Sequence, residues 1–314
     1  MSLPEYLLGT ALVAALAGAA GYAAHRLRAA KLPGWTGAPA RLVEAVAAIG
    51  LVAATAELLG LVGLIRPWAL VPALVAIAVA ARLGLRPPAP ADGPDPEAHS
   101  VPPAPPGAPS AALAGLAIAF LLVAQWGAFV AQNLDHGITN FDSVWYHLPF
   151  AAEIARTGSV TFLHHTETVF TNWFYPQNSE LFHGVAMTLT GHDFLSTFLN
   201  LGWLGLALLG GWCVGRPFGR PHLTMIAVAV VLATHTLVVR EPGTAKNDVT
   251  AIALGVSAVA ILLNRSSARK DGFGLVGPGW AVAAAGLAVG LAAGTKVTAL
   301  APAAMVTAAV LVAA

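Results

Sequence analysis

Ten runs of apolar residues, separated by short polar stretches, make up most of the chain. Nine are long enough to cross a bilayer, because a spanning helix needs roughly 20 mostly apolar residues. The run at 181–191 is too short, so it is interpreted as a re-entrant or interfacial helix. The pattern therefore predicts an all-α fold, a polytopic transmembrane helix bundle of about nine spans. The runs cover approximately 5–25, 42–64, 67–85, 111–131, 181–191, 193–215, 222–240, 248–264, 279–295, and 297 to the end.

Composition favours a membrane protein over a soluble domain, and it does not support a nucleic-acid-binding protein or a disulfide-stabilised scaffold. Of the 314 residues, 57% are hydrophobic and 10% are charged, whereas soluble domains carry about 25% charged residues. The net charge of +1 gives a nucleic-acid partner no electrostatic support. Cys213 is the one cysteine, so the chain contains no intrachain disulfide framework. The lipid bilayer is the partner that this composition predicts.

The basic residues predict the orientation of the bundle. A basic cluster follows the first apolar run instead of preceding it, which is typical of a retained anchor with an outer N-terminus. If the 26–41 loop is cytoplasmic and 181–191 does not cross, eleven of the 16 Lys and Arg residues face the cytoplasm. Abundant Ala, Gly, Val and Leu suggest a bacterial genome rich in G and C. We expect a multi-pass protein of a bacterial plasma membrane with an extracytoplasmic N-terminus.

Three regions are expected along the chain. Residues 1–85 form an N-terminal three-helix membrane segment, and 86–110 form a Pro/Ala-rich cytoplasmic linker. Residues 111–314 form a second membrane domain. Because the last apolar run ends without a polar tail, we expect the protein to continue beyond residue 314.

The longest loop outside the linker, 132–180, is expected to be the large first extracytoplasmic loop. It contains five acidic residues and four histidines, and loops of this length are usually functional. Ser143 or Asp142 can cap a surface helix that runs to about Arg156. The apolar face of that helix is expected to comprise Val144, Leu148, Ala151 and Ala155.

Two short turns, 240–248 and 294–298, are expected on the same side of the membrane as this loop. They contain Arg240, Lys246 and Lys296, together with Asn247 and Asp248. Charged groups at helix ends that face one side can converge, and charge close to hydrocarbon is costly. The turns and the loop therefore predict one functional site.

Four segments that share this side of the membrane resemble a known family. In chain order they read FDSVWYHLPFAAEIARTGSV, NWFYPQNSELFHGVAMTLTG, AKNDVTAIAL and GLAAGTKVTALAP. Together they resemble bacterial membrane glycosyltransferases of the C superfamily (GT-C), related to the protein O-mannosyltransferases and the lipid A aminoarabinose transferases. The resemblance covers about 111–300 and leaves out the first 110 residues.

The resemblance implies an enzyme that works on the extracytoplasmic side. Such enzymes move a sugar from a polyprenyl-phosphate-linked donor to a glycan, lipid or protein acceptor of the cell envelope. An acidic residue of the first large outer loop acts as catalytic base, and Asp142 matches it. The family usually has a second acid directly afterwards, where this chain has Ser143. That departure leaves the base and the acceptor open.

The residues themselves fit this chemistry. Inverting transfer needs a carboxylate to accept the acceptor's proton, and the departing lipid phosphate needs cations. Lys246, Lys296 and Arg240 are the phosphate-binding candidates. The substrate-binding candidates are His147, His164, His165, Tyr175, Glu180, Asn247 and Asp248.

Other interpretations of these residues stay open. Asp142, Glu180 and Asp248 could simply cap helices, and both lysines could be boundary residues that reach toward water. His164, His165 and Glu167 could hold a divalent metal, but adjacent histidines do not share a helix face. No cofactor is required, and a metal is not supported by the sequence.

Two other functions remain alternatives. A secondary transporter would carry ionisable residues at the membrane midplane and repeated halves, and no inverted repeat is recognised here. A non-catalytic membrane scaffold would tolerate alanine at Asp142 or Lys296.

Overall fold

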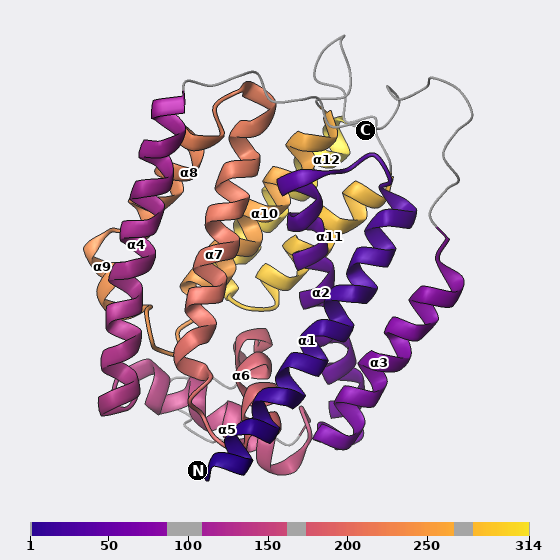
Figure 1. Cartoon of the computed structure of the whole chain (residues 1–314), viewed down its shortest axis with the longest axis vertical. Helices are drawn as coiled ribbons and strands as arrows, with labels where there is room; N and C mark the ends of the chain where they lie inside the picture. The colour runs from indigo at the N-terminus through magenta and orange to yellow at the C-terminus, as the bar shows by residue number, and fades with distance from the viewer. Residues whose placement is uncertain (1, 87–108, 162–173, 267–278, 314) are drawn as a thin grey trace.

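The protein is a bundle of helices in the computed structural model, which describes residues 2–86, 109–161, 174–266 and 279–313 (Figure 1). Within these ranges every regular element is a helix, which confirms the predicted all-α class. The helices are α1 (Leu3–Lys31), α2 (Gly37–Gly60), α3 (Pro67–Gly84), α4 (Pro109–His136), η1 (Ser143–His147), α5 (Leu148–Thr157), α6 (Asn178–Thr190), α7 (Ser196–Gly215), η3 (Arg216–Phe218), α8 (Pro221–Leu232), α9 (His235–Arg240), α10 (Asp248–Ser266), α11 (Gly279–Ala293), η4 (Val297–Ala299) and α12 (Leu300–Ala313).

Six of the described helices are long and apolar enough to cross a membrane, namely α1, α2, α3, α4, α7 and α10. This is consistent with a membrane protein. The expected span at 222–240 is instead interrupted after Leu232 and forms α8 and α9. The last two runs form α11 and α12, with 15 and 14 residues. The count of nine spans therefore stays a prediction.

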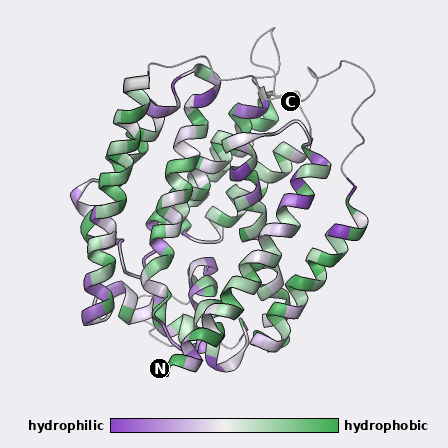
Figure 2. Ribbon diagram, viewed as in Figure 1, coloured by the Kyte–Doolittle hydropathy of each residue, from purple (hydrophilic) through white to green (hydrophobic). Residues whose placement is uncertain are grey.

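The outer surface of the bundle is apolar, as expected where lipid replaces water. Hydrophobic residues predominate along α1, α3 and α4 (Figure 2), and many of their large apolar side chains are exposed. On α4, for example, Leu113, Phe120 and Leu121 are each at least 65% exposed. A soluble protein rarely exposes apolar patches of this extent.

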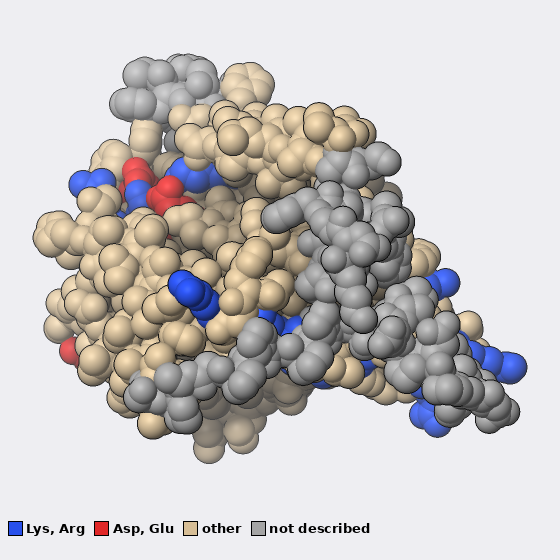
Figure 3. Space-filling model, turned by 90° about the horizontal axis from the view of Figure 1, so that it is seen from above, with Lys and Arg blue, Asp and Glu red and all other residues tan. Residues whose placement is uncertain are grey.

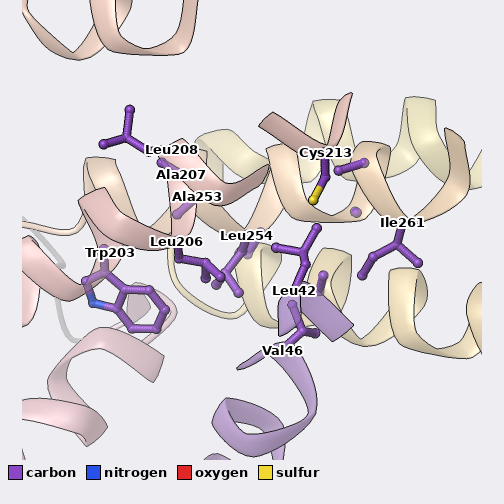
Figure 4. Packing of buried hydrophobic residues seen from close by; sticks show 14 of the residues in the cluster. Leu42, Val46, Trp203, Leu206, Ala207, Leu208, Cys213, Ala253, Leu254 and Ile261 are labelled. Atoms are coloured by element: carbon purple, nitrogen blue, oxygen red, sulfur yellow. The ribbon is translucent and has the colours of Figure 1, made fainter. Parts of the chain in front are cut away.

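The main core lies between α2, α7 and α10 (Figure 4). Leu42 and Val46 of α2 meet Leu206 of α7 and Leu254 of α10 in this core. Small residues allow close helix approach, as is common in membrane bundles. A Cβ added at Gly211 of α7 would lie 2.9 Å from the Val228 side chain of α8.

The N-terminal segment shares this core. A second hydrophobic cluster joins α1 and α3 to α5 and α6, and α2 contributes residues to both clusters. Residues 87–108, which contain most of the expected linker, lie outside the described residues. The expected division at 86–110 is therefore not tested, and α2 packs against both parts of the bundle.

The two ends of the bundle differ. The C-terminal ends of α1 and α7 lie in the upper part of Figure 1, while the N-terminus, α5 and α6 lie toward the lower end. The turn between α11 and α12 lies near mid-height, above α5. This recessed turn carries Lys296, so α5, α6 and the recessed turn frame the candidate site.

Candidate functional site

The expected surface helix exists, but it begins differently. Residues 143–147 form one π-helical turn that continues directly into α5. Asn140 caps it, because its Oδ1 accepts hydrogen bonds at 3.3 Å from both the amide and the hydroxyl of Ser143. Asp142 has helical backbone angles and makes no capping bond. The expectation that Ser143 or Asp142 caps this helix is therefore wrong, and the Asp142 carboxylate is left for another partner.

The buried face of this helix also differs from the expected one. Ala151 is buried as expected, but Val144 is 48% exposed and Leu148 and Ala155 are half-buried. The buried side chains are Ser143, His147, Phe150, Ala151 and Ile154. The polar Ser143 and His147 face inward because each has a partner there.

The turn between α9 and α10 is fixed in place by hydrogen bonds to buried polar side chains. The Asn200 Nδ2 of α7 donates to the backbone carbonyls of Glu241 (2.8 Å), Thr244 (3.2 Å) and Lys246 (3.0 Å). The Ser143 hydroxyl accepts from the Ala245 amide at 3.0 Å. Buried backbone groups without such partners would be costly. The turn is thus fixed to both α7 and η1, which orients Lys246.

Glycine is required at one position of this turn. Gly243 has φ +70°, in the left-handed region that side chains rarely adopt. A Cβ there would lie 2.5 Å from the Asn133 Nδ2, which donates to the Pro242 carbonyl at 3.2 Å. The end of α4 therefore packs directly on the turn.

Two ion pairs form the exposed part of the site. The Lys246 Nζ lies 2.6 Å from the Asp142 Oδ2, and the Lys296 Nζ lies 2.6 Å from the Asp248 Oδ1. The four side chains are 13–35% exposed, so all of them reach solvent. Lys296 also donates to the Asn247 Oδ1 at 3.3 Å. The site is therefore close to neutral overall, with each cation beside a carboxylate.

The second turn is joined to the first and to α6. The Asn247 Nδ2 donates to the Thr295 carbonyl at 3.0 Å. The Asn178 amide, at the start of α6, donates to the Gly294 carbonyl at 2.9 Å. The starts of α6 and α10 and the end of α11 consequently meet around Lys296.

Tyr146 lies among the acidic groups of the site. Burial raises the pKa of its phenol, and the charges of Asp142, Glu180 and Asp248 raise it further. Its ring lies 6.1 Å from that of Tyr175 at a near-perpendicular angle. Tyr146 is therefore a neutral hydroxyl, able to donate a hydrogen bond near both ion pairs.

A buried pair lies behind Tyr146. The His147 Nδ1 is hydrogen-bonded to the Glu180 Oε1, joining η1 to α6, and both residues are 2% exposed. His183 is buried next to them, and burial followed by the nearby His147 lowers its pKa to about 3. His183 is thus neutral at physiological pH. This layer supports the exposed residues and lies out of reach of solvent.

Glu241 is a buried acid beside the site. Its Oε2 accepts from the Val249 amide at 3.2 Å, near the start of α10. Burial, followed by the charge of Asp248, raises the pKa of Glu241 to about 8. Glu241 is therefore mostly protonated at neutral pH and adds little negative charge beside Asp248.

Among the sequence candidates that the structure describes, Arg240 is not joined to this cluster. Arg240 is exposed, and no described interaction joins its side chain to the two ion pairs. His164 and His165 lie outside the described residues, as does Glu167 of the proposed metal cluster. Within the described ranges no group of three His, Cys, Asp or Glu residues has metal-binding geometry.

Sequence reasoning missed three residues that shape the site, namely Tyr146, Asn200 and Glu241. Glu241 belongs to the turn singled out for its charges, but a turn acid is usually solvated. Asn200 is an amide within an apolar run, and a polar group at such a depth needs an internal partner. The free-energy cost of an unpartnered amide in an apolar run therefore indicates that Asn200 has an internal hydrogen-bond partner.

Comparisons of the chain with protein-family models, with curated proteins and with solved structures found no match.

Proposed function

We propose that the chain is a membrane glycosyltransferase that moves a sugar, with inversion, from a polyprenyl-phosphate-linked donor to a cell-envelope acceptor on the extracytoplasmic side. One observation carries this proposal. Asp142, Lys246, Asp248 and Lys296 come from three separate parts of the chain and converge as two partly exposed ion pairs. A carboxylate base and phosphate-binding cations are the groups that the transfer needs.

In the proposed reaction the acceptor oxygen attacks the anomeric carbon of the donor sugar. The new carbon–oxygen bond forms as the bond between that carbon and the phosphate oxygen breaks. Asp142 accepts the proton of the acceptor hydroxyl. The departing polyprenyl phosphate keeps the electron pair, and Lys246 and Lys296 stabilise its increased charge. The balance of atoms and charge requires no cofactor.

The ion pairs imply an exchange of partners when the donor binds. Without a ligand, Asp142 is 2.6 Å from Lys246. A donor phosphate that binds Lys246 competes with Asp142 for the same ammonium group. Asp142 is then freed to accept a proton, so the base becomes active only in the presence of donor. Asp248 and Lys296 form a second ion pair, and a phosphate that binds Lys296 would compete with Asp248 in the same way.

An apolar groove supports the choice of a lipid-linked donor. It has a volume of about 390 Å³ and lies between α7, α8, α10, α11 and α12. Ala251 and Ala299 line it, and each follows a site residue, Asp248 or Lys296, by three positions. A phosphate at the lysines would leave its lipid tail beside this groove.

The remaining candidates take supporting roles in the proposal. Tyr175 is 46% exposed, so it can contact the sugar. Asn247 orients Lys296 through its 3.3 Å hydrogen bond. His147 and Glu180 are buried, and the His147 ring lies 4.0 Å from that of Tyr146, so in the proposal this pair positions Tyr146. Arg240 is exposed and is joined to neither ion pair, so it would contact the phosphate only from the outer edge of the site.

The proposal is tested with purified full-length protein in lipid and a panel of radiolabelled polyprenyl-phosphate sugars. Cell-envelope extract serves as acceptor, and wild type is compared with Asp142→Ala and Lys296→Ala. We expect label transfer by the wild type and strong loss in both variants at unchanged folding. Transfer unaffected by Asp142→Ala would move the base to Asp248, which is partly exposed, rather than to buried Glu180. Absence of transfer from every donor would favour a secondary transporter or a scaffold.

A further inference from the structure

A second concentration of charge lies at the opposite end of the bundle, where α1 ends and α2 begins. Seen from that end, Lys and Arg side chains appear at several places, and Asp and Glu side chains appear at fewer (Figure 3). The positive-inside rule assigns such an end to the cytoplasm.

One carboxylate, that of Glu44, forms the ion pairs with most of the cations at the junction of α1 and α2. Glu44 is 8% exposed, and its Oε1 lies 3.0 Å from the His25 Nδ1 and 2.8 Å from the Arg28 Nε. Its Oε2 lies 2.6 Å from the Arg41 Nη1. A single negative charge is therefore shared by two arginines and a histidine, and the junction keeps an excess of positive charge.

Lys31 adds to this excess. No carboxylate pairs with it among the described residues, and its Nζ lies 4.9 Å from the centre of the Trp280 ring. Trp280, at the start of α11, is 48% exposed. An ammonium group over an indole face is attracted by the ring but keeps its full charge. Lys31 and Trp280 thus leave a cation available beside a large apolar ring.

A pocket of about 140 Å³ opens at this cation. The pocket is lined almost entirely by apolar surface, from Leu32, Val43 and Leu287 among others, and Lys31 and Trp280 are also among its lining residues. The pocket lies between α1, α2 and α11. It is large enough for a short stretch of one acyl chain, and Lys31 lies where the headgroup of that lipid would be.

We propose that this pocket binds an anionic phospholipid, with the headgroup phosphate at Lys31 and the start of one acyl chain against Val43 and Leu287. Two features select this ligand: a lysine without a carboxylate partner among the described residues, and a directly adjoining apolar wall. Basic pockets between membrane helices on the cytoplasmic side are suited to anionic headgroups. The bound lipid would join the N-terminal segment to α11, independently of the proposed transferase activity.

The test is native mass spectrometry of the full-length protein in detergent, titrated with phosphatidylglycerol or with phosphatidylcholine of the same acyl chains. We expect phosphatidylglycerol to remain bound in preference to phosphatidylcholine. Lys31→Gln should weaken phosphatidylglycerol binding about fivefold, because one Lys near an anionic surface contributes about that factor. Arg220→Gln is the matched control, since Arg220 is an exposed cation outside the pocket.

Three results would overturn the proposal. The first is equal retention of the two lipids by the wild type. The second is an equal loss in Lys31→Gln and Arg220→Gln, which would mean that overall charge, not the pocket, attracts the lipid. The third is full displacement by an equal concentration of glycerol 3-phosphate, which has the headgroup phosphate without acyl chains. Circular dichroism of both variants checks that they remain folded.

Discussion

The exchange of partners at Lys246 predicts that one substitution has opposite effects on binding and on turnover. Asp142→Asn keeps the shape of the side chain but removes the charge that holds Lys246 at 2.6 Å. A phosphate ligand then no longer competes with a carboxylate for the ammonium group. We therefore expect the variant to bind unsubstituted polyprenyl phosphate more tightly while it transfers sugar more slowly.

The size of the binding effect follows from the exposure of the pair. Lys246 and Asp142 are 13% and 35% exposed, and partly solvated pairs contribute about 1 kcal/mol. Since 1.4 kcal/mol corresponds to a tenfold change, the dissociation constant should fall about fivefold. Loss of a general base should lower the transfer rate by about 10²–10⁴.

Binding can be measured by titrating the purified protein in lipid nanodiscs with polyprenyl phosphate and following the shift in melting temperature. Asp135→Asn is the control, because Asp135 is an exposed acid at the end of α4, beside His136. Weaker binding of polyprenyl phosphate by Asp142→Asn would refute the competition between Asp142 and the ligand. Unchanged transfer would refute the role of Asp142 as base.

Three further predictions concern the same site. Lys296→Gln should weaken polyprenyl phosphate binding about tenfold or more, because a hydrogen bond to a charged group contributes about 1.5–3 kcal/mol; unchanged affinity in the same titration would remove Lys296 from the phosphate site. The pKa of Glu241 is about 8 in the fold, above its unfolded value, so the stability that its protonated form provides should be lost as pH rises through about 8. Melting temperatures from pH 5 to 9 should therefore decline more steeply for the wild type than for Glu241→Gln, and parallel curves would contradict the assignment. Gly243→Ala should lower the melting temperature more than Gly137→Ala does, because both glycines have positive φ but only a Cβ at Gly243 would meet the Asn133 side chain; equal losses would mean that backbone strain alone matters.

The long helices could be predicted from the sequence because length and apolarity decide whether a segment can span a bilayer. The interruption between α8 and α9 could not, since the run from 222 to 240 contains no proline or glycine that would mark a break. The sequence also does not indicate which residue caps the helix that begins at η1. Asn140, Asp142 and Ser143 are all good capping residues, and the bond from Ala245 to Ser143 decided how Ser143 is used.

The site was predictable only in part. The positions of the charged residues indicate which turns share a side of the membrane. They do not indicate which lysine forms an ion pair with which carboxylate. Asp142 and Lys246 are 104 residues apart in sequence, and a single sequence contains no signal for such a contact. Glu241 was missed because its burial depends on the packing of α10 against its turn.

The role of Asp142 in sugar transfer can be measured directly in proteoliposomes that contain only this protein, a radiolabelled polyprenyl-phosphate sugar and the acceptor extract. We expect transfer by the wild type and by Asp135→Asn, and a loss of at least about 10² in Asp142→Asn with polyprenyl phosphate binding retained. Equal transfer by Asp142→Asn and Asp135→Asn would mean that the Asp142 carboxylate has no part in the reaction.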